Sequence, residues 1–419
     1  MAKAIKGSKG SGDAAVADGD NVRLAEVGQA LFVKATGVGV AALAISAFLG
    51  MGEHDGWSRF SHSYLVAFVW VMTIGAGALW WVTIQNIVNS HWSLVIRRVG
   101  ELIAANAPVM ALLALPVVLP LIMGNPVLYR WADSSLMHES EELANKIGYL
   151  NTKFFAIRFV VYFGFWTLLS RFFLNRSLHQ DKEPEATAAK TVVSMRRLAG
   201  PAMIGYAITI TFCAIDLIMS LDPKWFSTMF GIYYFASCVL AVNASLALTV
   251  MWLQGKGRLT SSVTVHHFHD LGKMVFAFTI FWAYIGFSQF MLLWYANIPE
   301  ETLWFKERFA NSWGTLSWFL LFGHFVIPFF GLMSRWVKRN RKALAFWCIW
   351  QLVMIYVDMY WLIMPTTGAG EVPFALIDLT CWIGVLALFI AGVAYRAKGL
   401  DLIAKNDPRL PKSLAFENI

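Results

Sequence analysis

Residues 274–299, MVFAFTIFWAYIGFSQFMLLWYANIP, form an apolar stretch without a single Asp, Glu, Lys or Arg. A helix needs roughly 20 residues to cross the hydrocarbon core of a bilayer, so this stretch is long enough to span one. Tyr284, Ser288 and Tyr295 recur at helical spacing and therefore share one side of the predicted helix. We expect that polar side to pack against other helices or a wet cavity, because lipid cannot satisfy polar groups.

The rest of the chain repeats this pattern, which predicts an all-α integral membrane protein. Of its 419 residues, 58% are hydrophobic and only 14% are charged, so little of the chain is left for a soluble domain. Residues 1–30 are predicted to be a disordered cytoplasmic tail, 31–396 a ten-helix transmembrane domain, and 397–419 a cytoplasmic C-terminal tail. The ten predicted spans are 31–51, 61–88, 101–123, 154–175, 198–221, 227–254, 272–297, 312–335, 343–364 and 375–396.

The positive charges indicate how these spans are oriented. The net charge is +8, and most of the 34 Lys and Arg residues fall in the two end segments and in every second connection. Cytoplasmic segments of membrane proteins carry such an excess, so both termini are predicted to be cytoplasmic. Because the excess follows the topology instead of forming one patch, we expect no nucleic-acid binding.

The connections on the opposite side carry two helical patterns. MHESEELANK, residues 137–146, predicts an acidic helix, and Pro299 followed by two glutamates predicts the start of another. That second helix is expected to expose Leu303, Trp304 and Phe305, either to the membrane interface or to a partner protein.

No metal or haem ligand set is evident in the sequence. The four cysteines lie in apolar runs without a CxxC pair, which argues against an iron–sulfur cluster, a zinc site or a disulfide framework. His324 lies near the middle of a span, but no second histidine lies at a similar depth to complete a bis-histidine haem site. We interpret His324 as a proton carrier or as a buried hydrogen-bond partner, and expect no cofactor on this chain.

Span five carries a polar face. Tyr206, Thr209, Cys213, Asp216 and Ser220 follow one another at steps of three and four residues, which places them on one side of a helix. The pattern indicates either a hydrogen-bonding track that rises to an acid near the outer surface, or a contact between helices held by small polar groups.

Ionisable residues that are scattered in the sequence fall at the outer ends of their spans. They are His62, Arg158, Asp216, Asp358 and Asp378. A buried charge persists in a membrane only when it is paired or wet. We predict that Arg158 pairs with Asp216 or Asp358 while the other acid titrates, and that His62 and Asp378 are simply solvated. On the cytoplasmic side, Glu101 is predicted to form an ion pair with the preceding Arg97-Arg98.

Three stretches resemble a known family. They are WSRFSHSYLVAFVWVMTIGAGALWW (57–81), HWSLVIRRVGE (91–101) and FHDLGKMVFAFTIFWAYIGFSQFMLLWYANIPEET (268–302). They are similar to the ActF-type membrane subunit of bacterial alternative complex III, a quinol:electron-acceptor oxidoreductase. This subunit belongs to the NrfD group, which resembles the membrane subunit of polysulfide reductase. The resemblance implies a location in the bacterial inner membrane, with spans 2–5 and 6–9 forming two four-helix bundles and spans 1 and 10 flanking them.

The same resemblance implies partners and cofactors on other chains. Expected partners are an iron–sulfur subunit, multihaem cytochrome c subunits, a paralogous ten-span subunit that binds the quinol, surrounding lipids, and a terminal oxidase or soluble cytochrome. The complex would carry iron–sulfur clusters and haem c, and would oxidise menaquinol or ubiquinol.

Beside that resemblance, the ionisable residues suggest a role in proton transfer. The expected path uses Asp216, Asp358, Arg158, His324 and Glu101, with Thr209, Ser220 and Tyr206 as hydrogen-bonding steps. Three alternatives remain open: a quinol site in this chain built on His62, Asp216 or Asp378, a secondary transporter, and a passive scaffold.

Overall fold

The computed structural model describes residues 20–53 and 57–418, and these residues are almost entirely helical. Ten helical segments are long and apolar enough to cross a membrane, so all ten predicted spans are confirmed as helices. They are α1 (Ala25–Gly52), α2 (Ser58–Ile87), α3 (Leu94–Ala104) continued by α4 (Ala107–Leu113) and α5 (Leu115–Ile122), α8 (Thr152–Gln180), α9 (Glu185–Leu217), α10 (Phe230–Gly255), α11 (Val265–Ala296), α13 (Asn311–Leu320) continued by a π-helical turn (Leu321–Val326) and α14 (Ile327–Met333), α16 (Arg341–Ile363) and α17 (Leu376–Ala397).

The shorter helices lie in the connections between these segments. They are α6 (Ser134–Met137), α7 (Glu141–Lys146), α12 (Pro299–Arg308), α15 (Arg335–Arg339) and α18 (Leu410–Leu414). The two helices predicted in the outer connections are therefore present as α7 and α12. The Ser140 side chain caps α7 by accepting a hydrogen bond from Leu143 N, and α12 begins with Pro299, whose missing N–H costs nothing at that position.

The third span is broken into α3, α4 and α5 by its prolines. Pro108 and Pro116 lie in the first turns of α4 and α5, and Pro120 lies inside α5. Proline lacks the N–H that would continue the preceding helix, so each break falls just before a proline.

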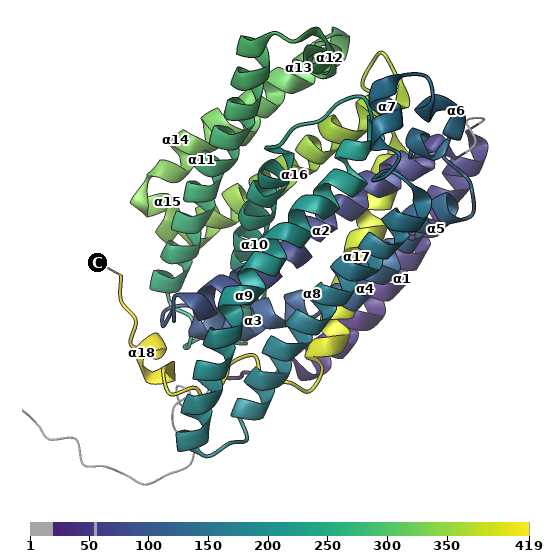
Figure 1. Ribbon diagram of the computed structural model, residues 1–419. Helices are drawn as coiled ribbons and strands as arrows, with labels where there is room; N and C mark the ends of the chain where they lie inside the picture. The colour runs from purple at the N-terminus through teal and green to yellow at the C-terminus, as the bar shows by residue number, and fades with distance from the viewer. Residues whose placement is uncertain (1–19, 54–56, 419) are drawn as a thin grey trace, which may run out of the picture.

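Helix α2 lies at the centre of the molecule and packs against α3, α9, α10, α16 and α17 (Figure 1). Of its most apolar window, 94% is buried inside the chain. Its crossing with α10 depends on Gly77, because a Cβ at that position would lie 2.2 Å from the Cys238 carbonyl oxygen. Helices α1 and α17 pair along one edge of the molecule, while α11, α14 and α15 pack together at the other edge (Figure 1).

Residues 20–24 and the segment after α17 pack against each other and against the helices. Leu402 N donates to the Val22 carbonyl at 2.7 Å, beside a bridge between Arg23 and Asp401. Ile403 and Leu410 are fully buried. Residues 397–418 are therefore not a free tail, because their apolar side chains and backbone groups find partners on the helices. Residues 25–30, predicted to be disordered, form the first turns of α1, and residues 1–19 of the predicted tail lie outside the described residues.

The polar side of α11 does not pack against the other helices of this chain. Tyr284 and Tyr295 are 63% and 85% exposed, so the polar side identified in the sequence lies on the outer surface of this chain. The buried side carries Trp282, Ile285 and Gln289 instead. Spacing alone defines the sides of a helix but does not say which side faces the other helices, and here the indole, amide and aliphatic groups point inward.

Candidate functional site

A buried ion pair joins α8 and α9. The Arg158 guanidinium donates through Nε to Asp216 Oδ2 at 2.8 Å and through Nη2 to Oδ1 at 2.9 Å. Its third nitrogen, Nη1, donates to the Tyr149 carbonyl, and its plane lies over the Tyr149 and Phe154 rings. This bidentate geometry is the strongest that an arginine and a carboxylate can form. The structure therefore identifies Asp216 as the acid that pairs with Arg158.

The remaining hydrogen-bonding capacity of Asp216 is also used. Tyr162, one turn after Arg158 on α8, donates its hydroxyl to Asp216 Oδ2 at 2.8 Å. Ser220 donates to the Asp216 backbone carbonyl and accepts from Trp131 Nε1 at 3.2 Å. Asp216 is only 2% exposed, so its charge is compensated entirely inside the protein. A carboxylate held in this way is an anchor between helices, because protonating it would break an ion pair and several hydrogen bonds.

The other polar residues of span five do not form one continuous track. Thr209 Oγ1 accepts from Trp166 Nε1 at 2.9 Å and donates back to its own helix at the Gly205 carbonyl, which is a contact between α8 and α9. The Tyr206 hydroxyl is buried without a hydrogen-bond partner among the described residues. Thr209 therefore fits the second interpretation of this polar face, a contact between helices held by small polar groups.

A second buried acid, Asp358 on α16, has a different environment. Its carboxylate accepts from the Tyr233 hydroxyl at 2.5 Å, from Trp282 Nε1 at 3.1 Å and from Ser237 Oγ at 3.5 Å. The side chain is fully buried, and no Lys or Arg within ion-pair distance is found among the described residues. Asp358 can therefore gain or lose a proton without breaking an ion pair, which Asp216 cannot.

His324 lies next to Trp282, one of the donors to this acid. Its ring stacks on Trp282, the residue that donates to Asp358, with 3.8 Å between ring centroids and 30° between planes. It is fully buried, and neither ring nitrogen has a hydrogen-bond partner among the described residues. A buried imidazole with two unused nitrogens departs from the rule that buried polar groups are paired, and such exceptions concentrate at functional sites.

The backbone around His324 departs from regular α-helix because of a nearby proline. His324 belongs to the π-helical turn, and Pro328 follows four residues later. Proline has no N–H to donate to the carbonyl four residues earlier, so the His324 carbonyl loses its ordinary helical partner. Gln351 Nε2 donates to that carbonyl at 3.3 Å and to Thr279 Oγ1 at 2.8 Å. Irregular turns of this kind occur inside helices most often at functional sites.

Asp378 forms a third buried cluster, at the start of α17. It lies within 2.5 Å of Arg59 Nη2, and accepts from Ser63 Oγ at 2.7 Å and from Ala375 N at 2.8 Å. Asp378 is fully buried and His62 is only 3% exposed, so the prediction that these two residues are solvated is wrong. Arg59 and Ser63 were missed as partners. A signal was available in the sequence, because Arg59 and Ser63 lie one turn apart at the start of span two, which is predicted to lie on the same side as Asp378.

The five outer residues therefore do not form one cluster. Asp216, Asp358 and Asp378 have separate sets of partners that share no side chain. His62 bonds within its own helix, to Ser58. The sequence predicted a common depth for these residues, but the lateral arrangement of the helices separates them.

Arg308 on α12 is a site residue that the sequence analysis missed. It is 1% exposed and donates to the carbonyls of Trp361 and Leu362, at 3.2 and 2.8 Å, at the end of α16. Burial lowers the pKa of Arg308 to about 9. The Trp304 ring covers its guanidinium at 3.5 Å and is 5% exposed, so the prediction that Trp304 lies on the surface is wrong. The cation–π contact with Trp304 and the carbonyls at the C-terminus of α16 stabilise the Arg308 charge, a role that a carboxylate commonly has.

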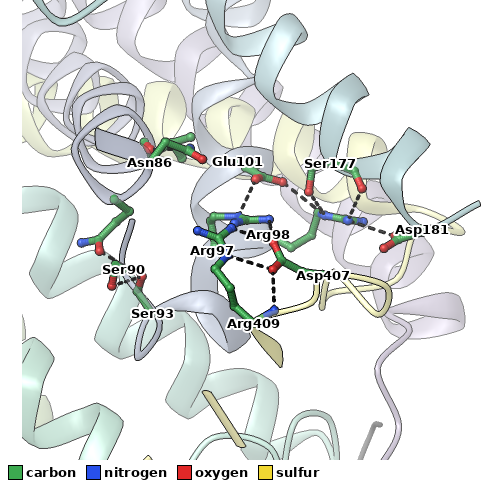
Figure 2. Close-up of polar contacts among 12 residues, drawn as sticks. Asn86, Ser90, Ser93, Arg97, Arg98, Glu101, Ser177, Asp181, Asp407 and Arg409 are labelled. Atoms are coloured by element: carbon green, nitrogen blue, oxygen red, sulfur yellow. Dashed lines mark hydrogen bonds and ion pairs between the residues drawn. The ribbon is translucent and has the colours of Figure 1, made fainter. Parts of the chain in front are cut away.

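At the opposite end of the molecule, the predicted pairing of Glu101 is confirmed. Glu101 lies 3.0 Å from Arg97 Nε and 3.2 Å from Arg98 Nε, and all three side chains are buried (Figure 2). Asp407, from the C-terminal segment, adds a second carboxylate on Arg97 and also pairs with Arg409 (Figure 2). The C-terminal segment therefore covers Glu101 and its two arginines.

The docking of this segment is expected to depend on pH. Burial alone would raise the pKa of Asp407, but hydrogen bonds and charges from Arg409 and Arg97 outweigh burial and hold this pKa below its ordinary value. A lowered pKa stabilises the docked segment above the undocked pKa of about 3.9, and this stabilisation is lost as pH falls through the lower, docked pKa. A spin label introduced by Lys412→Cys should be immobile at pH 7 and mobile only well below pH 4.

Asp407→Asn provides the control for that experiment. It removes the charge, so the label should be mobile already at neutral pH and show no further acid transition. A label that stays immobile at pH 7 in this variant would show that the ion pairs do not hold the segment.

Among the described residues, no group of three or more His, Cys, Asp and Glu side chains is arranged to hold a metal ion. The four cysteines are all buried and unpaired. Comparison of the sequence with protein-family models and with curated proteins found no match to this chain.

Proposed function

We propose that this chain is the ActF-type membrane subunit of a quinol-oxidising respiratory complex, and that it supplies a transmembrane proton path. In this proposal the ten apolar helices cross the bacterial inner membrane with both termini in the cytoplasm. The distribution of Lys and Arg between alternate connections supports that orientation. The resemblance of residues 57–81, 91–101 and 268–302 to that family supports the assignment.

The helix packing supports two four-helix bundles in this assignment. One would contain α2, α3–α5, α8 and α9, and the other α10, α11, α13–α14 and α16, with α1 and α17 outside them. Helix α2 contacts α3, α8 and α9, and α10 contacts α11 and α16, while α2 also packs on α10 and α16 and so joins the two proposed bundles. Each proposed bundle contains one buried aspartate on its last helix, Asp216 on α9 and Asp358 on α16.

The observation that carries the proton-path proposal is the environment of Asp358. It is a fully buried carboxylate with three donors and no cation within ion-pair distance among the described residues. The stacked pair Trp282–His324 continues from it toward Gln351, deeper in the membrane in the proposed orientation. Rotation of the His324 ring would let it exchange a proton with water in the path. Asp358 is the outer proton-exchanging group in this proposal, and His324 the middle one.

The other predicted path residues have supporting roles in this proposal. Arg158 and Asp216 lock α8 to α9 and fix the first bundle, with Ser220 and Thr209 as contacts between elements. Glu101 lies at the cytoplasmic end, where the arginine pair and Asp407 control access to it.

Purification of the natively expressed assembly tests membership of the complex. A redox-complex subunit should co-purify with haem-bearing and iron–sulfur partners, and the assembly should show the absorption bands of haem c. A chain that purifies alone, without haem, and gains stability from a small solute would instead support a transporter.

An aromatic groove favours a quinol site as the second candidate function. A cavity of about 350 Å³ between α13, α16 and α17 is lined by Tyr356, Tyr360, Phe374 and Trp382, and Tyr356 donates to the Asp378 backbone carbonyl. Its size and aromatic walls suit a quinone ring. Against this role, the Asp378 carboxylate is already occupied by Arg59 and Ser63 and is a poor proton acceptor. A quinone retained at this groove after purification would establish it.

A further inference from the structure

The connection between α10 and α11 binds the carboxylate of Asp20, which precedes α1. Oδ1 of Asp20 accepts from the Thr260 N–H at 2.9 Å and from the Thr260 hydroxyl at 3.3 Å. Oδ2 accepts from Ser261 N at 3.3 Å, and from Ser262 N and Oγ at 2.9 and 2.7 Å. Three successive backbone N–H groups and two hydroxyls therefore converge on one carboxylate. Successive backbone N–H groups that point to one place form an anion-binding concavity.

Other contacts give this connection its shape without help from the carboxylate. Gln254, in the last turn of α10, donates through Nε2 to the carbonyls of Leu259 and Val263, at 3.0 and 2.7 Å. Leu259 has a φ of 56°, in the left-handed region, and its side chain is fully buried. A residue with a Cβ keeps that conformation only where its surroundings fix it. The N–H groups of residues 260–262 are therefore held ready for an acceptor.

The hydrogen bonds at this site favour an ionised ligand. Burial acts to raise the pKa of Asp20, but hydrogen bonds from Ser262, Thr260 and Ser261 outweigh burial and hold this pKa below its ordinary value. Backbone N–H donors stabilise the charged form of a carboxylate in this way. At neutral pH the connection therefore holds an anion.

The residues that follow Asp20 join this connection to the C-terminal segment. Leu259 N donates to the Asn21 carbonyl at 3.2 Å, and Leu402 N donates to the Val22 carbonyl at 2.7 Å. The Val22 side chain is buried. One short segment thus contacts the α10–α11 connection on one side and the C-terminal segment on the other.

We propose that residues 260–262 form a carboxylate-binding site whose ligand is Asp20. The filled site ties residues 20–22 to the α10–α11 connection, and these residues in turn hold the C-terminal segment. A vacated site would accept another small carboxylate. This inference rests on neither the proposed complex nor the proton path.

Hydrogen–deuterium exchange of the full chain in lipid nanodiscs tests the site. Asp20→Ala should raise the exchange rates of the amides of residues 260–262 about tenfold, because each loses a charged acceptor. The Leu402 amide should also exchange faster. Unchanged rates at 260–262 would overturn the proposal, and an unchanged rate at Leu402 would overturn the tie to the C-terminal segment. Glu26→Ala removes an exposed acid from the first turn of α1, and this control should exchange as the wild type does.

Two neighbouring serines provide a matched pair of variants. Ser262→Ala removes the hydroxyl that donates to Asp20 at 2.7 Å, so the amides of Thr260 and Ser261 should exchange faster, though less so than in Asp20→Ala. Ser261 donates through its backbone N–H, which Ser261→Ala retains, so that variant should keep the wild-type rates. Equal effects of the two substitutions would contradict the assigned geometry.

Sodium acetate distinguishes a binding site from a purely local contact. In Asp20→Ala, acetate should restore slow exchange at residues 260–262, whereas sodium chloride at the same ionic strength should not. Leu402 should still exchange fast with acetate present, because acetate is not attached to residues 21 and 22. Failure of acetate to slow exchange at 260–262 would contradict a carboxylate-binding site, and slow exchange at Leu402 with acetate would contradict the tie.

Discussion

Asp358→Asn is expected to lower proton translocation coupled to quinol oxidation by about 100-fold or more, within the range that a positioned proton-transfer group contributes. The amide oxygen of asparagine can still accept from Tyr233, but the amide NH2 then replaces the oxygen that accepts from Trp282, so only part of the polar contact of Asp358 should survive. What is lost is the ability to exchange a proton. The measurement is the number of protons moved per electron in vesicles that contain the purified complex.

Two controls separate proton transfer from structural damage. Asp358→Glu keeps a carboxyl group and should restore part of the translocation. Ser237→Ala removes only the longest contact to Asp358, 3.5 Å, and should have little effect. An unchanged proton-to-electron ratio in Asp358→Asn, with the complex intact, would eliminate the path through this residue.

Arg158→Met is expected to have the largest effect on stability. It leaves the buried Asp216 carboxylate without its cation, and breaking a buried pair in this way costs roughly 3–5 kcal/mol. The free energy of unfolding should fall by this amount, measured by denaturant titration in detergent. The pair supplies two of the hydrogen bonds between α8 and α9, and Asp216 also accepts from Tyr162, so loss of assembly is the expected cellular result.

The double variant Arg158→Met/Asp216→Leu identifies the cause. Removing both charges leaves no uncompensated group, so much of the lost stability should return. Arg171→Met, at an exposed arginine on the same helix, is the matched control and should change stability little. If the double variant is as unstable as Arg158→Met, uncompensated charge is not the reason for the instability.

Some features of the site could be predicted from the sequence and others could not. Counting residues along each predicted span was enough to predict a similar depth for Asp216, Asp358 and Asp378. The partners of each acid could not be assigned, because they depend on which helices are neighbours. Arg59, four residues before Ser63 at the start of span two, was the available signal for Asp378. No comparable signal pointed to the carbonyl contacts of Arg308.

The number of long helices was determined by the sequence alone, whereas their limits were predicted only approximately, since α9 begins at Glu185 and the predicted span began at residue 198. Uncharged runs of sufficient length, prolines at the breaks of span three, and polar connections are local properties, and local hydrogen bonding is enough to make a helix. The ion pair of Glu101 with the preceding arginines was also local, at three and four residues' distance.

Only the tertiary structure decided which side of each helix is buried and which charges meet. Tyr284 and Tyr295 point outward, and Asp407 folds back onto Arg97 from more than 300 residues away. In an apolar chain most helix sides are almost equally hydrophobic, so hydrophobicity cannot orient them. Close packing at positions such as Gly77, and the need to pair each buried charge, then select one arrangement.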